Sequence, residues 1–125
     1  MLARHALSRR MLNTAQAKEL IAKTPVLLFM KGTPDQPMCG FSRAAVQLLQ
    51  MYKVPFASAN VLDGDETRDA VKEASAWPTF PQLHVNNELL GGFDVLLDHH
   101  REDTLFDEFS SRGIAVERPP PVDDE

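Results

Sequence analysis

Cysteine is almost absent from this chain of 125 residues, which contains only Cys39. A single cysteine excludes an intramolecular disulfide and therefore a disulfide-stabilised scaffold, and a reducing compartment is the better fit. Positive charge is also scarce, with 13 Lys and Arg against 18 Asp and Glu and a formal net charge of −5. We therefore expect no nucleic-acid partner, because nucleic acid requires a basic surface. Long apolar runs are missing too, so we expect no membrane partner.

The composition that remains, 43% hydrophobic and 25% charged, is typical of one globular domain. Residues 1–13 differ from the rest, because they contain Arg4, Arg9 and Arg10 and no acidic residue. Such a start is typical of a mitochondrial transit peptide, and the alternative is a short disordered basic tail. We assign residues 14–113 to the domain. Residues 114–125 are acidic and proline-rich, and we expect them to be disordered.

Hydrophobic periodicity and breaker residues predict the order of helices and strands. Helices are expected at 14–23, from Cys39 to about Tyr52, at 66–76 and over 94–112, where Asp103 is expected to cap a second helix. Strands are expected at 26–30, 56–61, 82–86 and 88–90, the last two as a hairpin around Asn86-Asn87. The first two strands are joined through a helix, so they should be parallel. The fold class is therefore α/β, a four-stranded mixed sheet flanked by helices.

The only thiol lies in the stretch KGTPDQPMCGFS, residues 31–42, where the first strand passes into a helix. An isolated cysteine is more often a small buried hydrophobic residue than a reactive group. The start of a helix reverses this expectation, because unpaired N–H groups and the helix dipole favour a thiolate. Lys31 adds a positive charge nearby. We therefore interpret Cys39 as the reactive residue.

Several motifs together resemble one family. The strand–loop–helix with its cysteine, the Thr-Phe-Pro corner and Gly-Gly-Phe-Asp resemble the thioredoxin fold. KGTPDQPMCGFS is similar to the monothiol glutaredoxins with a Cys-Gly-Phe-Ser active site, and WPTFPQLHVNNELLGGFD to their second half. The resemblance covers about residues 14–113, and the basic start resembles the mitochondrial single-domain, glutaredoxin 5-related type. Ser42 occupies the position of the second cysteine of dithiol relatives, so a redox cycle would end on an external thiol.

The resemblance implies a groove for glutathione. Lys31 and Arg68 would meet its glycine carboxylate, although Lys31 could be a solvated lysine and Arg68 a partner of Glu66 or Asp69. The resemblance also implies that the Phe80 backbone, which precedes a cis Pro81, pairs with the cysteinyl part of glutathione. Asp94 and the Phe93 backbone would bind its γ-glutamyl end. Asp94 could equally be a plain N-cap. Phe93 is bulkier than the residue many relatives carry and could narrow this pocket.

Two functions from different classes follow from the resemblance. The first is an iron–sulfur carrier in the mitochondrial matrix, a homodimer bridged by one [2Fe–2S] cluster through Cys39 and glutathione, with BolA-like proteins and apo iron–sulfur recipients as partners. The alternative is a glutathione-dependent reductase of protein–glutathione mixed disulfides, with Cys39 as the nucleophile. Whether the chain is an enzyme is left open. A redox-sensing interaction module is a third hypothesis.

The histidines give no functional signal in the sequence. His99 and His100 are adjacent, so on a helix they diverge and cannot share a metal as an i,i+4 pair would. His84 stands alone on a predicted strand. Trp77 is expected to pack against the Thr-Phe-Pro corner in a structural role.

Overall fold

The computed structural model describes residues 11–120. In chain order the elements are α1 (Thr14–Lys23), β1 (Val26–Met30), α2 (Gly40–Met51), β2 (Ala57–Asn60), the 3-10 turn η1 (Val61–Asp63), α3 (Asp65–Ser75), β3 (Gln82–Val85), β4 (Glu88–Gly91), α4 (Phe93–Arg101) and α5 (Leu105–Ser110). The predicted ranges 14–23 and 26–30 coincide with α1 and β1. None of the helices in the described part of the chain is both long and apolar enough to cross a membrane.

The four strands form one mixed sheet in the order β2-β1-β3-β4. β1 pairs in parallel with β2, with Leu28 opposite Ser58, and antiparallel with β3, with Leu28 opposite Leu83. β3 and β4 form the predicted antiparallel hairpin. The sequence prediction of two parallel strands followed by a hairpin is therefore confirmed. All five residues of β1 are buried, as expected of a central strand covered on both faces.

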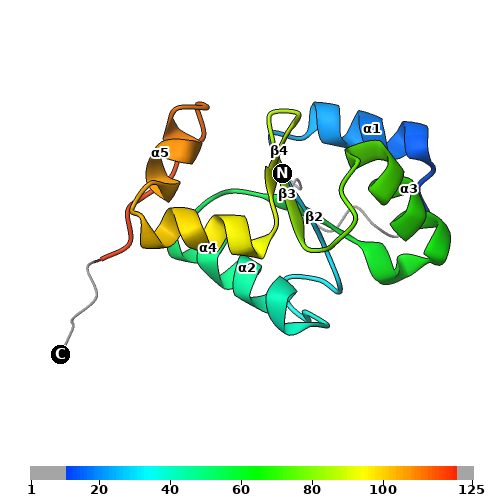
Figure 1. The fold of residues 1–125 in the computed structure, drawn as a ribbon, viewed down its shortest axis with the longest axis horizontal. Helices are drawn as coiled ribbons and strands as arrows, with labels where there is room; N and C mark the ends of the chain where they lie inside the picture. The colour runs from blue at the N-terminus through cyan, green and yellow to red at the C-terminus, as the bar shows by residue number, and fades with distance from the viewer. Residues whose placement is uncertain (1–10, 121–125) are drawn as a thin grey trace.

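Helices cover both faces of the sheet and give the domain two hydrophobic clusters, as Figure 1 shows. α2, α4 and α5 pack over one face, where Leu28 and Leu83 point. α1 and α3 pack over the other face, where Leu27 and Phe29 point. Because successive strand residues point to opposite faces, the run Val26–Met30 supplies both clusters at once.

The helical stretch predicted over 94–112 divides into α4 and α5 at Asp103, as expected, but Asp103 does not cap the second helix. Asp103 has φ 61 and follows the C-cap of α4, and its N–H donates to the His100 carbonyl at 3.2 Å. The Thr104 N–H donates to the His99 carbonyl at 2.8 Å, which completes a Schellman motif. Aspartate tolerates the left-handed conformation better than most residues, so this break forms without glycine. Thr104 is the residue that precedes α5.

Packing continues past residue 113, where the sequence placed the end of the domain. Ile114 and Val116 pack against the cluster under α2. The Glu117 N–H donates to the Tyr52 carbonyl at 2.9 Å. The Arg118 guanidinium lies 4.4 Å from the centroid of the Phe106 ring. These contacts attach the first part of the acidic segment to the domain, and residues 121–125 lie outside the described residues.

Packing also begins before residue 14. Leu12 packs against the cluster under α1, and its N–H donates to Thr67 Oγ1 at 3.0 Å. Asn13 is the N-cap of α1 and forms a capping box with Gln16, so each side chain accepts from the other's backbone N–H. Most of the predicted transit peptide, residues 1–10, lies outside the described residues.

Candidate functional site

The topology brings the predicted site segments to one end of the sheet. β1 ends at Met30 and leads to Lys31, and β3 runs antiparallel to β1, so its first residue, Gln82, lies at that same end. The loop 77–81 therefore arrives beside the loop that carries Cys39. β4 ends there too and passes directly into α4. Three of the six predicted site residues lie on these three connections: Lys31, Cys39 and Phe80. Phe93 is the first residue of α4. Asp94 follows in the first turn of α4.

Cys39 is the N-cap of α2, and Ser42 holds its sulfur. The Ser42 N–H donates to Cys39 Sγ at 3.3 Å, and the thiol lies 3.3 Å from Ser42 Oγ, to which it donates. Ser42 is fully buried, and its hydroxyl also accepts from the Lys31 N–H at 3.1 Å. When the sulfur is ionised, the hydroxyl is able to rotate and donate to it. From the sequence, Ser42 was interpreted only as the residue in place of a second thiol, and the structure adds the role of a hydrogen-bonding partner of the sulfur.

The pKa of the Cys39 thiol is lowered by its surroundings. Partial burial raises this pKa, but hydrogen bonds from the Ser42 side chain and from the backbone N–H groups of Ser42 and Phe41 lower it. The positive charge of Lys31 lowers it further. The stabilising contacts prevail, so the thiolate is favoured at the start of α2 as the sequence predicted. Cys39 is only half-buried, so its side chain is partly accessible from solvent.

A tight loop sets the position of Cys39 relative to β1. The Met38 N–H donates to the Lys31 carbonyl at 2.9 Å, and Gly32 bridges to Pro37. Gly32 has φ 93, and a Cβ there would lie 2.4 Å from the Gln36 carbonyl oxygen. The position therefore requires glycine. The closed loop presents the thiol next to the end of the central strand.

The loop 77–81 contains a cis peptide bond between Phe80 and Pro81, as the family resemblance implied. The Phe80 side chain is half-buried and packs against the cluster that α1 and α3 cover. Beneath the loop lies Gln82, whose Nε2 donates to the Thr79 carbonyl at 3.2 Å and to the Trp77 carbonyl at 3.4 Å. The loop is thus attached to β3 by a side chain that was assigned no role in the sequence analysis.

The start of α4 lies against this loop. A Cβ built on Gly92 would lie 3.3 Å from the Pro81 carbonyl oxygen. The Phe93 ring is half-buried, and its centroid lies 6.3 Å from that of the exposed Phe41 ring. The alternative interpretation of Asp94 as the N-cap is wrong, because Gly92 is the N-cap of α4. The Asp94 carboxylate instead accepts from the Val95 N–H at 3.0 Å and is exposed in the first helical turn.

Arg68 stands on α3, apart from the three connections. Its guanidinium Nη2 lies 3.0 Å from Asp65 Oδ1, so its partner is one turn back on the same helix. The alternative partners considered from the sequence, Glu66 and Asp69, are therefore wrong. The pair is exposed on the surface, where ion pairs contribute little to stability, so the guanidinium is free to exchange Asp65 for another carboxylate.

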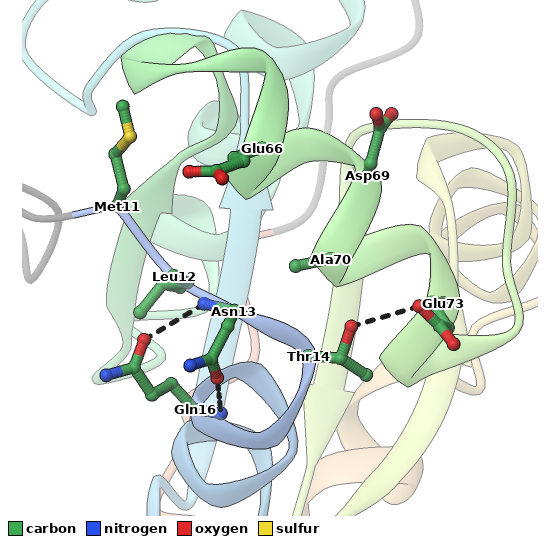
Figure 2. A pocket seen from close by; sticks show the side chains of 9 residues that line it. All are labelled: Met11, Leu12, Asn13, Thr14, Gln16, Glu66, Asp69, Ala70 and Glu73. Atoms are coloured by element: carbon green, nitrogen blue, oxygen red, sulfur yellow. Dashed lines mark hydrogen bonds between the residues drawn. The ribbon is translucent and has the colours of Figure 1, made fainter.

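A separate groove lies between the start of α1 and α3, as Figure 2 shows. Three acidic residues of α3, Glu66, Asp69 and Glu73, line it, and Thr14 Oγ1 donates to Glu73 Oε1 at 3.0 Å. None of the predicted site residues lines this groove. It is therefore distinct from the thiol site, which is an exposed end of the sheet.

The mixed sheet, the thiol at the N-terminus of α2 and the loop 77–81 beside it define a thioredoxin-fold protein with a single cysteine at one end of its sheet. The family model described as glutaredoxin matches residues 26–90, and the chain belongs to the glutaredoxin family. The sequence-based identification of the family is confirmed.

Individual relatives sharpen this placement. Mitochondrial glutaredoxin-related protein 5 of Danio rerio is 49% identical over 98 residues, which are 78% of this chain and 63% of that protein. Mitochondrial monothiol glutaredoxin-5 of Saccharomyces cerevisiae is 50% identical over 93 residues, 72% of this chain and 62% of that protein. The chain thus spans less than two thirds of the length of these two relatives. It is of the mitochondrial monothiol type, and the predicted mitochondrial localisation is confirmed.

Solved structures agree with the fold. A monomeric truncated mutant of Trypanosoma brucei 1-C-Grx1 superimposes with a TM-score of 0.76 at 30% identity, covering 86% of this chain and 97% of that one. The buckwheat glutaredoxin–glutathione complex superimposes with a TM-score of 0.68 at 20% identity, covering 80% and 89%. The second likeness concerns the fold alone. The thioredoxin fold predicted from the sequence is confirmed.

Proposed function

We propose that this protein binds a glutathione-ligated [2Fe–2S] cluster and transfers it to apo-proteins in iron–sulfur cluster assembly. The observation that carries the proposal is the single stabilised thiol of Cys39, next to a serine where dithiol proteins have a second cysteine. This arrangement provides one exchangeable ligand rather than a complete redox couple. Like the relatives named above, the protein would act in mitochondria, and we place it in the matrix.

Ligand number supports a shared site. A [2Fe–2S] cluster needs four ligands, normally thiolates, and one chain supplies only Cys39. Within residues 11–120, no three His, Cys, Asp or Glu side chains come together in a way that could hold a metal ion. Two chains and two glutathiones would supply the four sulfurs. The exposed side chains of Met38 and Phe41 beside the thiol offer apolar surface where the second chain would approach. The cluster is cargo, because ligands supplied by small molecules exchange readily.

Glutathione would lie across the three connections at the end of the sheet. Its glycine carboxylate would meet Lys31 and Arg68, the latter by leaving Asp65. The backbone of Phe80 would pair with the cysteinyl part, and the Phe93 backbone with Asp94 would hold the γ-glutamyl end. A glutaredoxin of the same fold has been solved as a glutathione complex, which supports a glutathione site on this architecture. BolA-like proteins and apo iron–sulfur proteins are the proposed partners.

The lowered pKa of Cys39 favours a second candidate function, the reduction of protein–glutathione mixed disulfides. The thiolate would attack the glutathione sulfur, which releases the protein as its thiolate and leaves a disulfide between Cys39 and glutathione. A second glutathione thiolate would then attack that disulfide, which regenerates the Cys39 thiolate and releases oxidised glutathione. Ser42 cannot replace the second glutathione, so the rate would depend on glutathione concentration.

Anaerobic reconstitution with iron, sulfide and glutathione separates the two functions. We expect visible charge-transfer absorption and a dimer in the native protein, and neither in the Cys39→Ser variant, which loses the only cysteine ligand. Turnover on a glutathionylated peptide is measured in parallel. A native protein that stays colourless after reconstitution refutes cluster binding, and turnover no faster than the background reaction refutes the reductase.

A further inference from the structure

Gln82 and His84 form a buried polar pair on a face of the sheet that is otherwise apolar. Gln82 has no exposed surface and His84 has 2%, and both point to the same face as Leu27 and Phe29. His84 Nε2 lies 2.6 Å from Gln82 Oε1, and its ring packs edge-on against Phe29 at 5.6 Å between centroids. A buried amide lowers stability unless it is hydrogen-bonded, so this pair requires an explanation.

Every polar group of the Gln82 side chain has a partner. Nε2 donates to the carbonyls of Trp77 and Thr79, and Oε1 accepts from His84. The two carbonyl partners fix which way the amide faces, because only its NH₂ group is able to donate to them. Burial lowers the pKa of His84 to about 4, so at neutral pH the ring is neutral and its proton lies on Nε2, facing Oε1. His84 therefore holds the orientation of the Gln82 amide.

The Trp77 and Thr79 carbonyls belong to the loop segment that directly precedes Phe80, whose backbone would pair with the cysteinyl part of glutathione. We infer that Gln82, oriented by His84, is a positioning residue that fixes the loop 77–81 for glutathione binding. The inference rests on the proposed glutathione site. The Gln82 amide joins β3 to two carbonyls of an irregular loop and so restricts the loop conformations before the ligand binds. Less conformational entropy is then lost on binding, which strengthens it. Gln82 itself does not touch the ligand.

The test is the Gln82→Met variant, which keeps the length of the side chain and removes its donors. Gln50→Met, an exposed change at the far end of α2, is the matched control. Reduced glutathione is titrated into each reduced protein and followed by NMR shifts of backbone amides. We expect binding about tenfold weaker in Gln82→Met and unchanged in the control, because the loop must then be ordered by the ligand.

Two further readouts separate positioning from general damage. Trp77 is the only tryptophan, so its fluorescence reports on the loop and should change in Gln82→Met. The pH profile of Cys39 alkylation in Gln82→Met should equal that of the native protein, because the sulfur is hydrogen-bonded to Ser42 and not to Gln82. If Gln82→Met does not fold, His84→Phe is used, which keeps an aromatic ring against Phe29 and releases the amide. We expect the same weakening, to a smaller extent.

The outcomes are distinct. Native protein that binds no glutathione refutes the proposed site itself. Native protein that binds, together with a folded Gln82→Met that binds equally well, refutes only the positioning role. An altered Cys39 pH profile or failure of both variants to fold also overturns it, because the pair would then support the domain as a whole.

Discussion

Two pairs of polar side chains lie at the end of the sheet that carries the thiol, and the two pairs differ in their exposure to solvent. Cys39 and Ser42 lie at the start of α2, where the sulfur is half-exposed and its hydrogen bonds stabilise a charge. Gln82 and His84 lie inside the cluster on the opposite face, where burial disfavours charge and the Gln82 amide donates to backbone carbonyls. The first pair is suited to chemistry and the second to geometry.

Hydrogen bonds at the two pairs have different consequences because water reaches only one of them. At the exposed thiol, water competes with Ser42, so the effect is a moderate bias toward the thiolate. Inside the cluster no water competes for the hydrogen bonds of Gln82 and His84, so the loss of one partner leaves the other as a buried polar group without a hydrogen bond. Changes to the buried pair should therefore affect stability and loop order, whereas changes to the exposed pair should affect reactivity.

The largest expected effect is on stability at acidic pH and concerns His84. Burial lowers its pKa from 6.5 to about 4, so between these values the unfolded chain binds a proton that the folded chain does not. The stabilisation by neutral His84 is complete above pH 6.5 and is lost as the pH falls to 4, by up to about 3 kcal/mol. Urea unfolding at a series of pH values measures this loss.

The His84→Phe variant is the control for that loss. Carboxylates that titrate in the same range are present in both proteins, so their contributions cancel in the difference. The His84 ring packs against Phe29 and is hydrogen-bonded to Gln82, and neither of these side chains titrates. We expect the native protein to lose stability more steeply than the variant as the pH falls. Parallel curves would mean that His84 accepts its proton in the folded state.

The next effect is on the reactivity of Cys39 and concerns Ser42. Replacing Ser42 with alanine removes the side-chain hydrogen bond to the sulfur and leaves the backbone one, so the pKa of Cys39 should rise. A hydrogen bond to a charged group contributes about 1.5 kcal/mol when buried and less at a partly exposed site. We expect alkylation by iodoacetamide at neutral pH to slow by about three- to tenfold.

Ser58→Ala is the matched control for this change. Ser58 is 2% exposed in β2, so the variant also removes a buried hydroxyl, but one that takes no part in the hydrogen bonds to Cys39 Sγ. Its alkylation rate should equal that of the native protein. Equal rates in Ser42→Ala and the native protein would assign the lowered pKa to the backbone N–H groups and Lys31 alone.

The predictability of each region follows from how local its determinants are. α1 and β1 were predicted to the residue, because helix formers before Pro25 and an unbroken apolar run decide them locally. Cys39 was identified because a thiol at a strand–helix junction carries its own signal. The break at Asp103 was predicted, but the role of this residue as an N-cap was wrong, because a left-handed aspartate has no distinct pattern in one sequence.

The Gln82–His84 pair was missed for a different reason. Its hydrogen bonds join β3 to loop carbonyls, and backbone carbonyls leave no trace in a sequence. A signal was nevertheless available, because two polar residues at i and i+2 of a fully buried strand share one face and must be hydrogen-bonded. Ser42 had a comparable signal, three residues after a helix-capping Cys39.

The smallest expected effect concerns Lys31, whose charge acts in partly exposed surroundings at the thiol end. Lys31→Glu reverses a charge where the glycine carboxylate of glutathione would lie, so glutathione affinity should fall about two- to fivefold at low salt. Lys18→Glu makes the same change on the exposed surface of α1 and should leave the affinity unchanged. Salt screens such interactions, so added salt should narrow the gap between the two variants. Equal glutathione affinity of Lys31→Glu and the native protein at low salt would remove Lys31 from the site. Arg68 alone would then bind the glycine carboxylate of glutathione. The charge of Lys31 would serve only to lower the pKa of Cys39.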